Sequence, residues 1–119
     1  MKRSDSELDS VLNAVAGYFA VLAEPTRLRI LRALCQGERT VGRIVEETGI
    51  SQPTVSRHLG ALHRQRIAAR RREANLVYYR VADAATPKLC RVVCSRVAHA
   101  MAGRPRLRRH LETAFESRS

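Results

Sequence analysis

Aromatic residues are scarce in this 119-residue chain. It contains no tryptophan, and its two phenylalanines and three tyrosines amount to 4% of the residues. Proteins that bind single-stranded nucleic acid stack the bases on aromatic side chains, so this shortage argues against that class. The chain also lacks a run of about 20 apolar residues, which a transmembrane helix requires. We therefore expect no association with a membrane.

The chain is too short for two ordinary domains. Its apolar fraction of 45% is enough for one modest hydrophobic core. We expect a single domain over residues 1–119, with a flexible N-terminus at residues 1–7 and a C-terminal extension at residues 104–119.

Acidic residues are few relative to basic ones. Asp and Glu total 11 against 22 for Lys and Arg, so the formal net charge is +11. A positive charge of this size in a small chain is typical of a protein that binds a polyanion. We therefore expect double-stranded DNA as the partner and prefer it to a membrane surface.

Only three cysteines are present, Cys35, Cys90 and Cys94. Their odd number and their spacing match neither a disulfide framework nor a zinc finger with paired ligands. Free thiols fit a reducing compartment, so we expect a cytoplasmic protein. Catalytic motifs are lacking too, because no phosphate-binding loop, nucleophile elbow or HExxH segment occurs, and we expect no enzyme activity.

The N-terminal third of the chain has apolar residues at helical spacing. A first helix is expected from about Leu8 to Glu24, because Pro25 disfavours helix in the residue before it. Pro25 itself suits the first turn of a second helix, which should end before Gly37.

Two shorter helices follow. Thr40 can cap a third helix that Gly49 closes, and Ser51 can cap a fourth helix that tolerates Pro53 in its first turn. These two helices, with the short turn TGIS between them, have the spacing of a helix-turn-helix.

After Ile67 the apolar residues change from helical spacing to a period of two residues. The next residues are expected to form a strand, a tight turn at residues 73–75 and a returning strand. Helical spacing returns over residues 84–102 and again over residues 106–115. We therefore predict a mainly α protein with a small β-hairpin, a winged helix-turn-helix of five to six helices in which the hairpin is the wing.

The fourth helix and the hairpin carry the residues expected to bind DNA. Near the start of the helix are side chains able to read base edges in a major groove, namely Gln52, Thr54, Ser56, Arg57 and His58. Around them are groups suited to phosphates, namely Ser51, Arg64, Arg70, Arg71, Arg72 and Arg80. A run of arginines usually does no more than solvate a surface. Here it directly follows a helix-turn-helix in a very basic chain, which favours the phosphate role.

Three segments together resemble one protein family. VLAEPTRLRILRAL, VGRIVEETGISQPTVSRHLGAL and ARRREANLVYYRV are similar, in this order and spacing, to the ArsR/SmtB family of winged helix-turn-helix repressors, and the similarity runs from about Val11 to His99. The sequence departs from the family at Ala74, where members often have Gly in the turn of the wing. The resemblance implies a homodimer that sits on an operator and leaves it when an effector binds.

The first and fifth helices carry more apolar surface than one small core needs. We predict that they form the dimer interface, with Leu8, Leu12, Val15, Phe19, Leu89, Val93, Val97 and Met101. A twofold dimer would present its fourth helices to two half-sites of an inverted repeat, about one turn of DNA apart.

The cysteines are candidates for an effector site. Cys90 and Cys94 lie one helical turn apart, where Cβ atoms are about 5 to 6 Å apart, whereas a disulfide needs about 3.8 Å. A soft metal or metalloid ion tolerates the wider separation, and Cys35 could supply a third thiolate to it. Alternatively, an oxidant or reactive sulfur species could link Cys35 to Cys90 or Cys94.

Two simpler interpretations stay open. The three cysteines could be small buried hydrophobes, as free cysteines often are. The chain could also bind DNA without any sensor site. The family includes both metal-responsive and thiol-redox members, so the resemblance does not choose among these alternatives. Its zinc-type site is incomplete here, because Asp83 and His99 match two ligand positions while Ala85 and Arg96 occupy the others.

Overall fold

The computed structural model describes residues 3–101 and 103–116, and these form six helices and a three-stranded sheet. The elements in chain order are α1 (Arg3–Leu22), α2 (Pro25–Cys35), β1 (Arg39–Thr40), α3 (Val41–Thr48), α4 (Gln52–Arg64), β2 (Ala68–Glu73), β3 (Leu76–Val81), α5 (Ala85–Ala100) and α6 (Pro105–Thr113). The prediction of a mainly α winged helix-turn-helix is confirmed. Within the described residues, no helix is both long and apolar enough to cross a membrane.

The helix boundaries follow local signals. Pro25 occupies the first turn of α2, after an extended Glu24. The Thr40 side chain accepts a hydrogen bond from the Arg43 backbone N–H at the start of α3. Gly49 ends α3 in the left-handed conformation, with φ 72°, a conformation that costs glycine little.

One expectation at a helix start is wrong. Ser51 does precede α4, but its hydroxyl bonds the Thr54 hydroxyl at 2.9 Å and does not cap the backbone. Helix α1 begins at Arg3, within residues 1–7, for which we expected a flexible N-terminus. Asp5 in the first turn favours this early start, because a carboxylate stabilises the positive end of the helix dipole. Residues 1–2 lie outside the described part, as do residues 117–119 of the expected C-terminal extension.

The sheet has the strand order β1-β3-β2 and is antiparallel throughout. Glu73 pairs with Leu76, so the hairpin turn consists of Ala74 and Asn75 and is shorter than the expected turn over residues 73–75. Ala74 has φ 54°, a left-handed conformation that disfavours any residue with a Cβ atom. The departure from glycine therefore leaves local strain in the turn.

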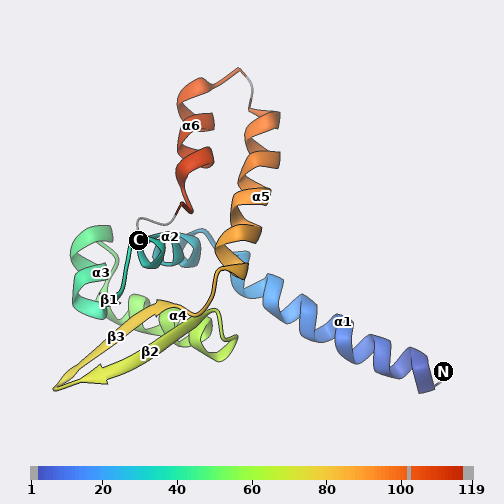
Figure 1. The fold of residues 1–119 in the computed structure, drawn as a ribbon, viewed down its shortest axis with the longest axis horizontal. Coiled ribbons are helices and arrows are strands. Elements are labelled where there is room, and N and C mark those ends of the chain that lie inside the picture. The colour runs from blue at the N-terminus through green and yellow to red at the C-terminus, as the bar shows by residue number, and fades with distance from the viewer. Residues whose placement is uncertain (1–2, 102, 117–119) are drawn as a thin grey trace.

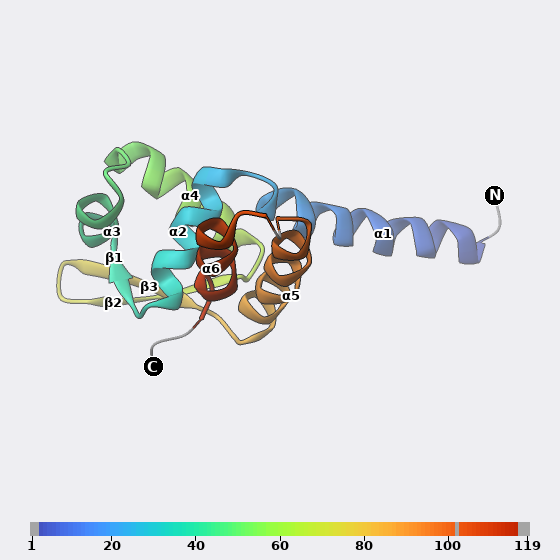
Figure 2. The same cartoon turned by 90° about the horizontal axis from the view of Figure 1, so that it is seen from above.

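The hydrophobic core lies between α2, α3, α4, the base of the sheet and the buried face of α5. Ile30, Leu31, Ile44, Leu59 and Leu62 are fully buried there. Helices α5 and α6 form an antiparallel pair beside this core, and α1 extends away from it so that only its C-terminal end lies against the body (Figures 1 and 2).

Candidate nucleic-acid interface

The helix-turn-helix is built by α3, the turn after it, and α4. The Thr48 hydroxyl donates to the Ile44 carbonyl at 2.6 Å and accepts from the Ile50 backbone N–H at 3.2 Å, which fixes the turn. The start of α4 and the tip of the β2–β3 hairpin lie at the end of the molecule away from the N-terminus of α1 (Figure 2). Helix and wing are therefore placed to reach the same ligand.

Four of the five expected base-reading residues lie at the surface of α4. Gln52 and Arg57 are exposed, and Thr54 and Ser56 are half-buried. The Gln52 amide donates to the Ser56 hydroxyl at 3.1 Å. Because this bond and the bond between the Ser51 and Thr54 hydroxyls hold the polar side chains together, they form an ordered hydrogen-bonding surface on one face of the helix.

His58 does not belong to this surface, and its assignment as a base reader is wrong. Its side chain is 1% exposed, and its Nδ1 accepts a hydrogen bond from Arg27 Nε at 3.1 Å. The sequence contained the signal, because His58 falls at helical spacing with the buried Val55, Leu59 and Leu62.

The wing arginines divide into two groups because successive side chains of a strand point to opposite faces. Arg70 and Arg72 share one face of β2 and are exposed. Among the described residues, neither has a carboxylate within ion-pair distance. Both keep an unneutralised charge that can meet a phosphate.

Arg71, on the other face, was expected to bind phosphate, and the structure gives it a different role. Its guanidinium holds both oxygens of Glu38, at 2.7 and 2.9 Å, and reaches Glu73 Oε2 at 2.6 Å. It also lies 4.5 Å from the centre of the Tyr78 ring. Hydrogen bonding to Arg71 lowers the pKa of Glu38, and nearby Arg80 lowers it further. Arg71 therefore ties the wing to the start of β1.

The remaining expected phosphate ligands lie at the edges of this surface. Ser51 and Arg64 are exposed at opposite ends of α4, and Arg80 is exposed on β3. Arg39 and Arg43 were not among the expected ligands, and Glu47 Oε1 pairs with both at 2.8 Å. An acidic partner therefore neutralises the arginines beside α3, whereas α4 and the wing keep arginines without an acidic partner among the described residues.

The three cysteines are free and buried, and all belong to the core. Burial raises the pKa of each thiol, and that of Cys90 reaches about 11, with the neighbouring Cys94 and Cys35 thiols contributing. Within the described residues, no three His, Cys, Asp or Glu side chains are close enough together to hold a metal ion. The expected three-thiolate site is therefore not formed in this conformation.

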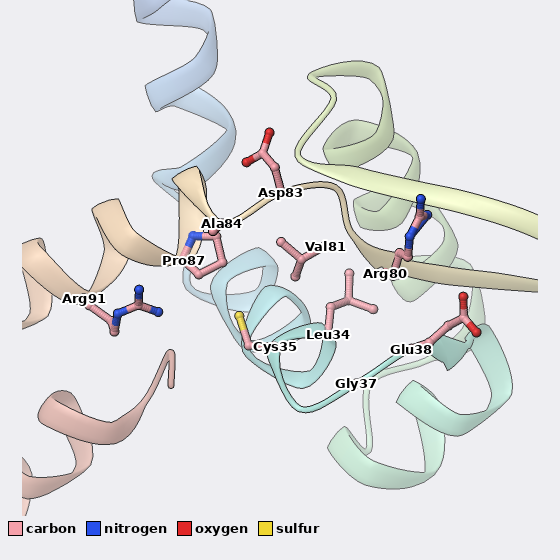
Figure 3. Close-up of a pocket in the computed structure, with 10 residues that line it drawn as sticks. All are labelled: Leu34, Cys35, Gly37, Glu38, Arg80, Val81, Asp83, Ala84, Pro87 and Arg91. Atoms are coloured by element: carbon pink, nitrogen blue, oxygen red, sulfur yellow. The ribbon is translucent and has the colours of Figure 1, made fainter. Parts of the chain in front are cut away.

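Cys35 also lines a cavity of about 430 Å³ beside α5. Figure 3 shows it on the wall of this cavity, with Pro87 and Arg91 of α5 facing it. Glu38 and Arg80 lie at the other end, near the wing. The cavity thus extends from Cys35 to the base of the wing.

The apolar faces of α1 and α5 remain uncovered in the single chain. Phe19 is 50% exposed on α1, and Val93 is 50% exposed on α5. Six of the eight expected interface residues are exposed, namely Leu8, Leu12, Val15, Phe19, Val93 and Val97, while Leu89 and Met101 are half-buried. Val11 and Val92 extend the same faces and were not among the expected residues.

Comparison with known proteins supports the resemblance. Residues 24–70 match the family described as bacterial regulatory protein, arsR family. A biofilm growth-associated repressor from Xylella fastidiosa is 36% identical over 89 residues, which cover 75% of this chain and 76% of the relative. The chain belongs to the arsR family of bacterial regulatory proteins. As an arsR-family protein it is a regulator of transcription and not an enzyme.

Two further proteins are similar to this chain. A probable mercury resistance operon repressor from Streptomyces lividans is 42% identical over 71 residues, which cover 60% of this chain and 57% of the relative. A solved homodimeric winged helix-turn-helix DNA-binding domain, from a possible ArsR-family regulator of Mycobacterium bovis, has a TM-score of 0.64 at 38% identity. That match covers 68% of this chain and 75% of the other.

Proposed function

We propose that this protein is a transcriptional repressor that binds an inverted-repeat operator as a homodimer and releases it when an effector acts on its cysteines. The observation that carries the DNA-binding part is the polar face of α4 beside a wing whose Arg70 and Arg72 are unneutralised. The helix supplies groups that read bases, including Gln52 and Arg57, and the wing supplies cations for phosphates.

The homodimer would form through α1 and α5. Both helices expose apolar side chains that the core of one chain does not cover, and exposed apolar patches of this kind mark interaction surfaces. The related Mycobacterium bovis domain is homodimeric, which supports the same assembly here. Twofold symmetry would place the two α4 helices in successive major grooves about one turn of DNA apart.

The effector would act by linking α2 to α5. Cys35 ends α2, which supports the helix-turn-helix, and Cys90 and Cys94 lie on α5, the proposed dimer helix. An oxidant that removes two electrons and two protons would join Cys35 to Cys90 or Cys94 by a disulfide. The bond would move α5 relative to α2, and so change the spacing of the two α4 helices in the dimer.

A soft metal or metalloid ion is the second candidate effector. The mercury resistance relative favours it, since the name of that protein connects it with a soft metal. The lack of a group of three metal ligands among the described residues favours the disulfide, because a disulfide requires only two sulfurs. A metal site would require all three thiols to converge and lose their protons.

The test uses reduced protein and a labelled duplex from the region upstream of its own gene. Fluorescence anisotropy measures binding while soft metals, As(III), a disulfide-forming oxidant and polysulfide are added in separate titrations. Mass spectrometry of the released protein then distinguishes a bound ion from a new sulfur bond. Failure of the reduced protein to bind this duplex would refute the repressor proposal.

The matched control replaces all three cysteines with serine. The variant should bind the duplex as tightly as the wild type and should stay bound with every effector. Normal release of the variant would mean that the thiols are not the sensor. If neither protein responds to any effector, the chain binds DNA without a thiol sensor.

A further inference from the structure

A buried polar contact connects α4 to the junction between α1 and α2. His58 lies on the core side of α4, and its Nδ1 accepts a hydrogen bond from Arg27 Nε at 3.1 Å. Its Nε2 is buried and lies 3.3 Å from Glu24 Oε1 without forming a hydrogen bond. The neutral ring must carry its proton on Nε2, since Nδ1 is the acceptor.

Arg27 is the centre of this junction. Besides His58, its Nη1 donates to the Val21 carbonyl in the last turn of α1 at 3.2 Å. Its Nη2 lies 3.3 Å from Glu24 Oε2, in the residue that precedes α2. One guanidinium therefore holds together the end of the proposed dimer helix, the start of α2 and the buried face of the proposed DNA-reading helix.

We propose that His58 is a positioning residue that holds α4 in place against the α1–α2 junction, and that it does so only in its neutral form. The inference rests on the proposed DNA-binding function of α4. A proton on Nδ1 would bring an N–H donor against the Arg27 N–H donor, so the bond between them would break. Arg57, next to His58 in the chain, faces the proposed DNA side of α4. Any change in the position of α4 on the core therefore also moves Arg57.

The charges around His58 support this dependence. Three charged groups act on the ring: Glu24 from the residue before α2, Arg27 from α2 and Arg57 from α4 itself. Burial lowers the pKa of His58; Glu24 opposes this shift, and both arginines add to it. The ring is therefore neutral at neutral pH. The hydrogen bond from Arg27 to His58 is therefore fully formed when the pH is above the ordinary pKa of histidine. It is lost as the pH falls through the lowered pKa of His58 in the folded protein.

The experiment measures operator affinity from about pH 7.5 to about pH 5.5 at constant salt. His58→Asn keeps an acceptor oxygen near the position of Nδ1 but cannot be protonated. The wild type should lose about tenfold more affinity across this range than His58→Asn does. His63→Asn, at the other end of the same helix, is the matched control and should follow the wild type.

Parallel pH profiles for the wild type and His58→Asn would overturn the inference. If His58→Asn does not fold, NMR of the wild type replaces it. The midpoint of the His58 ring titration must then coincide with the loss of affinity, and a clear separation of the two midpoints overturns the inference. The proposed function has a separate test, because its failure appears as absent binding by the wild type at about pH 7.5.

Discussion

Replacing the wing arginines one at a time counts the phosphates that the wing contacts. Each phosphate contact contributes about 0.9 to the slope of log affinity against log salt concentration. A homodimer carries two wings, so Arg70→Ala or Arg72→Ala should remove two contacts and lower the slope by about 1.8. Over a rise of about fourfold in salt, a slope change of this size corresponds to about tenfold in relative affinity.

Arg71→Ala should behave differently because its guanidinium is already paired with Glu38 and Glu73. Removing it should leave the salt slope nearly unchanged and should lower the melting temperature, since the wing loses its tie to β1. Fluorescence anisotropy of an operator duplex at several salt concentrations gives the slopes, and circular dichroism gives the melting temperatures. An equal fall in the slope for Arg71→Ala and Arg70→Ala would show that Arg71 also contacts a phosphate.

Three further substitutions test base reading by α4, the strain in the hairpin turn and the dimer interface. Arg57→Ala should cost about 1 to 3 kcal/mol of operator affinity and relax base preference, and an equal loss on all sequences would contradict a base-reading role. Ala74→Gly should stabilise the fold by about 0.5 to 1 kcal/mol in urea unfolding, because it relieves the strain of the left-handed conformation. A loss of stability would contradict the presence of strain at Ala74. Val15→Asp should give monomers in analytical ultracentrifugation, and an unchanged dimer would exclude the α1 face.

Much of the fold follows from local signals that a sequence displays directly. Pro25, Thr40 and Gly49 act on their own neighbours through backbone geometry, so the ends of α2 and α3 could be predicted. The strand β1 could not, because Arg39 and Thr40 have no strand pattern of their own and become a strand only by pairing with β3. Contacts between distant segments supply that information.

The candidate site likewise combines features that helical spacing predicts with features that depend on contacts between distant segments. The polar face of α4 follows from helical spacing, and the same spacing puts His58 on the buried face with Val55 and Leu59. The role of Arg71 depends on Glu38, which is 33 residues away in the chain. Three adjacent arginines look equivalent in a sequence, and only the pairing of the strands shows that the middle one faces a carboxylate.

We propose that two copies of this chain bind one inverted-repeat duplex through their α4 helices and wings. Sedimentation of the reduced protein with a fluorescent duplex from its own upstream region tests it most directly. We expect a complex of two chains per duplex that a scrambled duplex of the same length displaces poorly. A protein that stays monomeric and leaves the duplex free at moderate ionic strength would contradict it.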